Sequence, residues 1–110
     1  MPSNDEYTPD EPPRAEVEQY AGPTVLEFGN NWCGYCRRAQ PLIAEAFAAY
    51  PEMRHLRIAD GPGRPLGRSF RVKLWPTLIF MREGREVARL VRPGMTEEIQ
   101  RALERVSGPA

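Results

Sequence analysis

The segment Thr24–Cys36, TVLEFGNNWCGYC, joins an apolar run to both cysteines of this 110-residue chain. The run is rich in β-forming residues, whereas the residues after Cys33 place apolar side chains at the three- and four-residue spacing of a helix. We therefore expect Cys33 and Cys36 to lie at the start of a helix, within reach of each other. Unpaired backbone N–H groups and the helix dipole stabilise a thiolate there. Such a pair suits reversible thiol–disulfide exchange.

The composition points to one globular domain rather than to a nucleic-acid or membrane protein. Apolar residues make up 41% of the chain and the formal net charge is zero, which gives no support for a polyanionic partner. No apolar run approaches the roughly 18 residues of a membrane helix, and residues 1–6 lack the basic start and apolar core of a secretory signal. We expect a cytoplasmic monomer. In that compartment a cysteine pair is more often catalytic or metal-binding than structural.

The rest of the sequence alternates predicted strands and helices. Residues 1–13, rich in proline and carboxylates, are expected to form a flexible arm ahead of a domain over residues 14–110. Glu83-Gly84 is typical of a hairpin turn, Pro41 interrupts the second helix, and Thr96 can cap the last one. Strands are predicted over residues 24–29, 54–59, 77–81 and 87–91, and helices over residues 14–20, 33–50, 65–70 and 96–107.

This order of elements, together with four local features, resembles the thioredoxin family. Trp32-Cys33-Gly34-Tyr35-Cys36 resembles the family's Trp-Cys-Gly-x-Cys motif, and Pro41 stands where thioredoxins carry a helix-kinking proline. Trp75-Pro76-Thr77 resembles their Ile-Pro-Thr, whose proline is cis, and Gly84 falls in the hairpin turn, as in that family. The resemblance covers residues 14 to 107. It implies an α/β thioredoxin fold, with a central mixed four-stranded sheet flanked by helices and room for a short fifth strand at the N-terminus.

The two cysteines are expected to play different roles. Cys33 should be the attacking thiol, because it lies nearer the helix end, is more exposed, and has Arg37 and Arg38 close by. Cys36 should be the buried thiol that resolves the mixed disulfide. A structural zinc half-site is the alternative, but zinc generally takes four ligands, and His55 is the only other histidine or cysteine in the chain. We therefore expect no bound metal.

Glu27 is the only ionisable residue of the first predicted strand. It stands six residues before Cys33, where the resemblance implies a buried aspartate. Burial disfavours the charged form, so we expect a raised pKa and a role in taking the proton of Cys36. The alternative is that Glu27 points outward at a sheet edge. His55 stands near the position of a buried lysine in the family, although a lone histidine is more often a satisfied surface or core residue.

The substrate is expected to bind around the cysteines. Trp32 and Trp75 would flank them as an apolar rim, and Gly34 and Tyr35 lie between them. If Pro76 is cis, as the resemblance implies, the backbone of Trp75 faces the thiols and can pair with an extended substrate segment. Trp75 occupies a position that usually holds a smaller aliphatic residue in the family, and core packing is its alternative role.

These residues predict a thiol–disulfide oxidoreductase that reduces protein disulfides through Cys33 and Cys36. The chain has no dinucleotide or flavin motif and needs no bound cofactor, so its electrons must come from another protein. By the resemblance, that protein is a flavoprotein thioredoxin reductase. Two alternatives stay open at this point. One is an oxidase or isomerase of folding proteins, and the other is a thioredoxin-fold binding module whose CxxC is a regulatory switch.

The residue between the cysteines leads to a prediction about the reduction potential. Tyr35 stands where a typical thioredoxin has proline, and it adds a backbone N–H near the Cys33 sulfur. An added donor stabilises the thiolate, and therefore the reduced protein. We predict a potential above the roughly −270 mV of thioredoxin and below roughly −120 mV. Equilibration with glutathione buffers measures this potential, and a value outside that window would contradict the interpretation.

Overall fold

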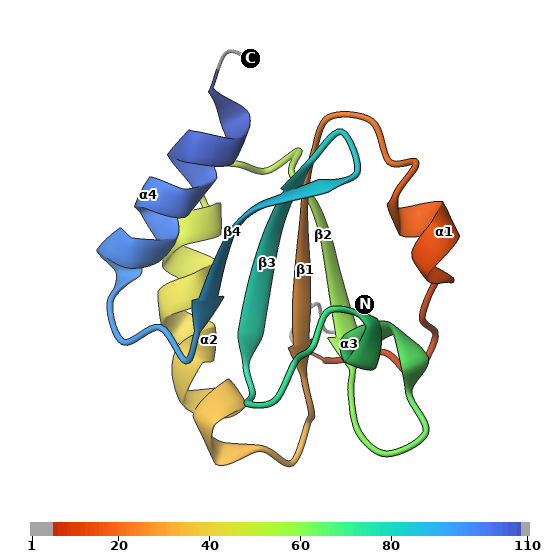
Figure 1. The fold of residues 1–110 in the computed structure, drawn as a ribbon. Coiled ribbons are helices and arrows are strands. Elements are labelled where there is room, and N and C mark those ends of the chain that lie inside the picture. Colours follow the sequence, from red (N-terminus) through yellow and green to blue (C-terminus); the bar gives the residue numbers. More distant parts are fainter. Residues whose placement is uncertain (1–5, 109–110) are drawn as a thin grey trace.

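The computed structural model describes residues 6–108, which form a mixed four-stranded sheet in the order β2-β1-β3-β4 (Figure 1). β1 runs parallel to β2 and antiparallel to β3, which in turn pairs antiparallel with β4. This is the mixed four-stranded sheet that the family resemblance implies. The strands are β1 (Pro23–Gly29), β2 (Arg54–Ala59), β3 (Thr77–Arg82) and β4 (Arg85–Val91).

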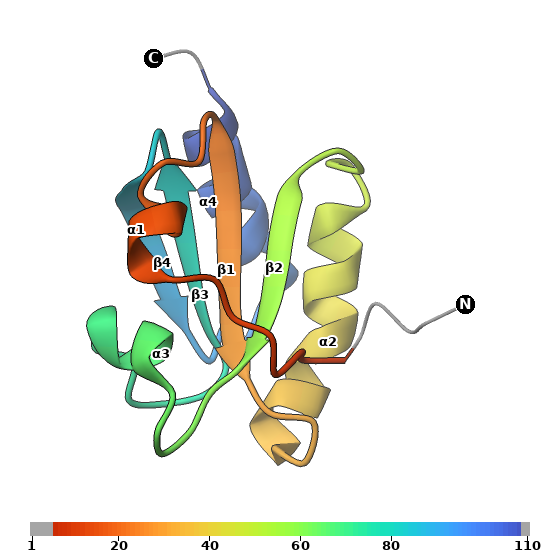
Figure 2. The same ribbon diagram turned by 90° about the vertical axis from the view of Figure 1, so that its right-hand side faces the viewer.

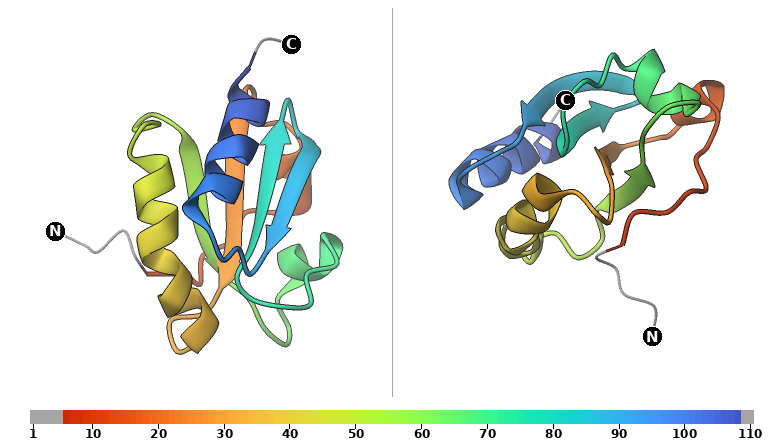
Figure 3. Two further views of the ribbon diagram at one scale, coloured as in Figure 1. Left: turned by 90° about the vertical axis from the view of Figure 1, so that its left-hand side faces the viewer. Right: turned by 90° about the horizontal axis from the view of Figure 1, so that it is seen from below.

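Helices cover both faces of the sheet (Figures 2 and 3). They are α1 (Arg14–Val17), α2 (Gly34–Phe47), α3 (Pro65–Ser69) and α4 (Thr96–Ser107). α2 and α4 lie on one face, and α1 and α3 on the other. No helix within residues 6–108 is long and apolar enough to cross a bilayer. The sheet therefore separates two apolar cores, one under each pair of helices.

The side chains of β1 alternate between these two cores, because successive residues of a strand point to opposite faces. Val25 packs with α2 and α4, whereas Leu26 and Phe28 pack with α1 and α3. All three are fully buried. Glu27 shares the parity of Val25, so the strand directs its carboxylate toward the side of α2.

Several predicted boundaries and contacts are refined by the structure. α1 ends at Val17 and α2 at Phe47, each three residues earlier than predicted. Pro41 lies inside α2, as predicted. The prediction that Thr96 caps α4 is wrong: Met95 holds the cap position, and the Thr96 hydroxyl instead donates to Glu45 (3.3 Å), which ties α4 to α2.

The predicted hairpin turn joins β3 to β4. Glu83 and Gly84 both have positive φ, at 51° and 75°, which matches the twist that a two-residue hairpin needs. A Cβ on Gly84 would also stand 1.9 Å from the carbonyl oxygen of Glu18. The turn therefore requires glycine both for its conformation and for its contact with the segment after α1.

The predicted flexible arm is partly built into the fold. Residues 1–5 of the arm lie outside the described residues. Thr8 forms one parallel bridge to β2, donating to the Arg57 carbonyl (2.9 Å) and accepting from the Ala59 amide (2.8 Å). The predicted fifth strand is thus a single bridge in the part of the chain that the structure describes. Tyr7 is only 4% exposed. The prediction of a flexible arm is therefore wrong for Tyr7 and Thr8. The buried Tyr7 ring and the Thr8 bridge attach this otherwise polar segment to the domain.

Candidate active site

Both cysteines lie where β1 ends and α2 begins. Cys33 occupies the N-cap position of α2, and its Sγ accepts a hydrogen bond from the Cys36 N–H at 3.2 Å. Both are free thiols. Cys33 is 7% exposed and Cys36 is fully buried, so Cys33 is the more accessible sulfur, as predicted. The amide donor seen at Cys33 Sγ belongs to Cys36 rather than to Tyr35, so the predicted effect of Tyr35 on the potential stays a prediction.

Two tryptophans form a rim beside the cysteines. Trp32 is 71% exposed, and its ring meets that of Trp75 edge to face, with 5.6 Å between centroids. Trp75 is half-buried and packs against the cysteine pair. Its Nε1 donates to Asp60 Oδ2 at 2.8 Å. The Trp75–Pro76 peptide bond is cis, as expected from the resemblance.

The carbonyl of Trp75, which we expected to be open to a substrate backbone, has a partner within the chain. Arg92 Nε donates to it at 2.8 Å, and the Arg92 guanidinium lies 3.7 Å from the centroid of the Tyr35 ring. Arg92 and Tyr35 also line a groove of about 390 Å³ that extends to Leu42. A bound chain must share the Trp75 carbonyl with Arg92 or displace it. The sequence did not indicate this contact, since it depends on the reach of one long side chain.

Glu27 is the centre of a buried polar cluster. Its carboxylate is fully buried and lies 2.8 Å from His55 Nε2, while Gln40 Nε2 donates to it at 3.1 Å. Arg57 donates at 3.3 Å, and the Tyr7 hydroxyl donates as well. The parallel register of β1 and β2 sets Arg57 directly beside Glu27. The outward-facing alternative for Glu27 is therefore wrong, and His55 belongs to the cluster.

The predicted raised pKa of Glu27 is also wrong. Burial alone would raise it, but the hydrogen bond with His55 and the positive charge of Arg57 outweigh burial and hold the pKa of Glu27 below its usual value. The sequence argument counted only burial, because it could not place Arg57 or His55 next to the carboxylate. Glu27 is therefore a carboxylate at neutral pH.

Tyr7 connects this cluster to the cysteines and is the residue that the sequence argument missed. Its ring packs with Cys33 and Cys36, and its hydroxyl also accepts from Gln40 Nε2 at 3.1 Å. Gly29 makes the approach possible: a Cβ there would stand 2.7 Å from both Cys36 Sγ and Tyr7 Cζ. An aromatic residue within an otherwise polar arm was the one available signal.

The two groups at this junction both hold their protons tightly. Burial, and then the charge of Glu27, raise the pKa of Tyr7 well above its usual range. Burial, and then the hydrogen bond with Cys33, raise the pKa of Cys36 to about 12. Cys36 is therefore a protonated thiol in the reduced protein, and any reaction through it must first remove that proton.

Comparison with known proteins places this site in a family. The thioredoxin family model matches residues 7–105. This chain belongs to the thioredoxin family. It is 33% identical to thioredoxin H5 of Oryza sativa subsp. japonica, over 86% of this chain and 69% of that protein. It is 55% identical to thioredoxin 2 of Pseudomonas aeruginosa PAO1 in its reduced form. The two structures superpose over 96% of this chain and 98% of that chain, with a TM-score of 0.86. A mutant thioredoxin of Halobacterium salinarum, 20% identical with a TM-score of 0.74 over 100% of this chain and 98% of its own, shows the same fold.

As a thioredoxin, the protein is a thiol–disulfide oxidoreductase, which is the activity predicted from the Cys33–Cys36 pair. Thioredoxins act on disulfide-containing proteins and depend on a reductase partner. The oxidase or isomerase and the binding module are not favoured. Within residues 6–108, no group of three or more His, Cys, Asp or Glu side chains is placed to hold a metal ion.

The difference between the two thiols can be tested by alkylation. At about pH 8, brief iodoacetamide treatment of the reduced native thioredoxin should label Cys33 and leave Cys36 untouched. A thiol with a pKa of about 12 holds only about one part in 10⁴ as thiolate at that pH. Peptide mass spectrometry locates the label. Denatured protein, labelled at both sites, is the control, and equal labelling of the two in the native protein would contradict the assignment.

Proposed function

We propose that this thioredoxin reduces protein disulfides in the cytoplasm, as a monomer without a bound cofactor, with electrons from an NADPH-dependent flavoprotein thioredoxin reductase. The observation that carries the proposal is the cap of α2, where the more accessible Cys33 sulfur accepts the amide hydrogen of Cys36. A cytoplasmic setting is supported by the cysteine count, because the sequence has no cysteines besides this pair that could form a structural disulfide.

The proposed reaction moves two electrons to the substrate in two exchanges. The Cys33 thiolate attacks one sulfur of the substrate disulfide, forming a mixed disulfide and releasing the other substrate sulfur as a thiolate. Cys36 then loses its proton and attacks Cys33 Sγ, which forms the Cys33–Cys36 bond and releases the second substrate thiolate. The released thiolates take up protons from solvent, and the reductase returns two electrons to the pair.

The surface around Cys33 suits an extended substrate. Nothing lies within 4 Å of the point where a Cβ on Gly34 would stand, so the surface next to Cys33 is open at this residue. The exposed rings of Trp32 and Tyr35 supply contact area for a bound chain. We assign substrate contact to these residues and to Trp75 and Pro76.

We propose that Tyr7 carries the Cys36 proton to Glu27. Tyr7 packs against Cys36, and its hydroxyl donates to Glu27. Its oxygen can therefore accept the thiol proton while its own hydrogen moves to the carboxylate. Tyr7 stays neutral in this transfer, as its raised pKa requires. The lowered pKa of Glu27 means that the proton does not rest there and passes on to solvent.

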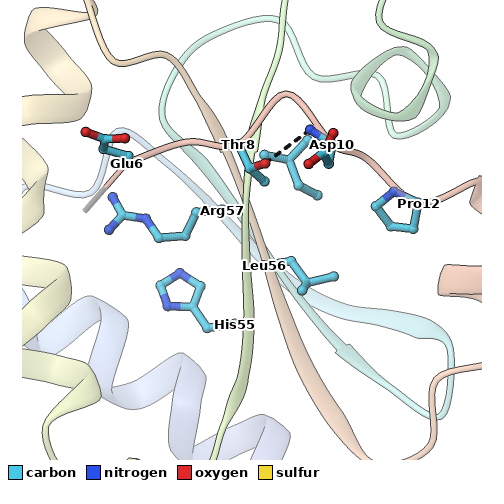
Figure 4. Close-up of a pocket in the computed structure, with 8 residues that line it drawn as sticks. Glu6, Thr8, Asp10, Pro12, His55, Leu56 and Arg57 are labelled. Atoms are coloured by element: carbon cyan, nitrogen blue, oxygen red, sulfur yellow. Dashed lines mark hydrogen bonds between the residues drawn. The ribbon is translucent and has the colours of Figure 1, made fainter. Parts of the chain in front are cut away.

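His55 lies on the way to solvent. Together with Arg57 it lines a cavity of about 450 Å³ between the N-terminal segment and β2. Figure 4 shows both side chains reaching from β2 in the same direction, while Leu56 points the other way. Among residues 6–108, neither cysteine and neither tryptophan lines this cavity. A proton that leaves through it therefore does not cross the bound substrate.

A coupled insulin-reduction assay tests the proposed function. With NADPH and a bacterial thioredoxin reductase, the protein should accelerate insulin reduction, and Cys33→Ser should abolish this activity. Cys36→Ser keeps the attacking sulfur but cannot resolve, so it should accumulate mixed disulfides that dithiothreitol releases. Failure of the wild-type protein to reduce insulin with either a reductase or dithiothreitol would refute the proposal.

Tyr7→Phe separates the proton step from the attack. Reaction with Ellman's reagent releases one coloured thiolate when Cys33 attacks and another when Cys36 resolves. The variant should keep the rate of the first release and slow the second by about 10- to 100-fold, at the low end of general acid–base effects. Tyr20→Phe, which removes an exposed hydroxyl bonded to Glu16, is the matched control. A second release at the wild-type rate in Tyr7→Phe would rule out the proton path.

A further inference from the structure

Positive charge gathers at the end of the sheet that carries Cys33. The start of α2, the segment from β2 through α3 to β3, and the β4–α4 loop all meet at this end (Figures 1 and 3). Residues 28–38, 60–76 and 91–96 make up these segments and carry seven of the chain's 15 basic residues but one of its 15 acidic residues. Their net charge is therefore +6 and that of the remaining residues is −6, although the whole chain is neutral.

One part of this charge surrounds a pocket beside Trp75. The pocket has a volume of about 440 Å³, and its lining includes Arg64, Arg68, Arg71 and Lys73. Trp75 forms one wall of it and also packs against the cysteine cluster. A chain whose disulfide reaches Cys33 can therefore extend past Trp75 and place its next residues in the pocket.

Most of these cations lack an acidic partner within the described part of the protein. Asp60, the one acidic residue of the pocket, accepts from Trp75 Nε1. Arg68 and Arg71 are exposed and form no side-chain ion pair with any residue from 6 to 108. The same is true of Lys73, so the charge of the pocket is available to a partner.

A second part of the charge lies on the other side of the cysteines. The guanidinium groups of Arg38 and Arg92 stand 5.5 and 3.7 Å from the centroid of the Tyr35 ring. Both line the groove next to Leu42. An extended segment that crosses Cys33 thus meets basic side chains both before and after its disulfide.

We propose that these residues, Arg38, Arg68, Arg71, Lys73 and Arg92, form a basic rim that selects disulfide substrates with acidic residues next to the reacting cysteine. The inference rests on the proposed function and names the substrate class of the same site. Carboxylates beside the disulfide are attracted to both sides of the site, whereas basic flanks are repelled. Arg92 is half-buried and the other four side chains are exposed, so each contact is weak. The selection arises from their sum, mainly as a faster encounter that salt screens.

Three disulfide peptides test this rim directly. They are identical except that the two residues on each side of the cysteine are Glu, Gln or Lys. The rate constant for oxidation of the pre-reduced protein is followed by tryptophan fluorescence, without any reductase. At low ionic strength the Glu peptide should react about tenfold faster than the Gln peptide, and the Lys peptide about tenfold slower. These ratios should shrink toward one at about 0.5 M salt.

Two double variants with the same change in net charge locate the effect. Arg68→Gln with Arg71→Gln should lower the rate with the Glu peptide by about three- to tenfold and leave the Gln peptide unchanged. Arg101→Gln with Arg105→Gln, on exposed positions of α4, should leave both rates unchanged. Equal rates for the three peptides at low salt, or equal losses in the two double variants, would overturn the inference. If no peptide oxidises the protein at all, the proposed function itself fails.

Discussion

A carboxylate shut away from water is held by side chains from three separate parts of the chain. Glu27 has no exposed surface, and Tyr7, Gln40, His55 and Arg57 reach it from the N-terminal segment, α2 and β2. Removing one partner of a buried ion pair typically costs about 3–5 kcal/mol, because an uncompensated charge is left behind. The edge strand, the first half of α2 and the N-terminal segment are therefore positioned by one charged group in the central strand, directly behind the reactive thiols.

The two cysteines in front of this group have unlike surroundings. Cys33 lies at the mouth of the site with amide hydrogen bonding, while Cys36 lies against Tyr7 in a region where burial favours the protonated thiol. The attacking sulfur thus faces the substrate, while the resolving sulfur faces the interior. In the proposed reaction, substrate approaches from the rim of tryptophans and the proton leaves on the side of β2.

Much of this arrangement follows from the sequence because its signals are local. The spacing of Cys33 and Cys36 and the apolar run of β1 each depend on neighbouring residues, and the structure agrees with them. The cis bond before Pro76 was expected from the family resemblance, and the structure has it. The direction of the pKa shift of Glu27 could not be predicted, because it depends on the strand register that places Arg57 beside the carboxylate. The burial of Tyr7 was missed because the composition of residues 1–13 is polar overall and does not show which single side chain the fold buries.

Position 29 cannot accept a larger residue without disturbing the site. The last residue of β1 has no side chain, and the sulfur of Cys36 and the ring of Tyr7 meet in the space that one would fill. Even a methyl group at this position would force the aromatic ring or the sulfur to move. The close packing of Cys36 and the attachment of the N-terminal segment through Tyr7 therefore both require glycine at position 29.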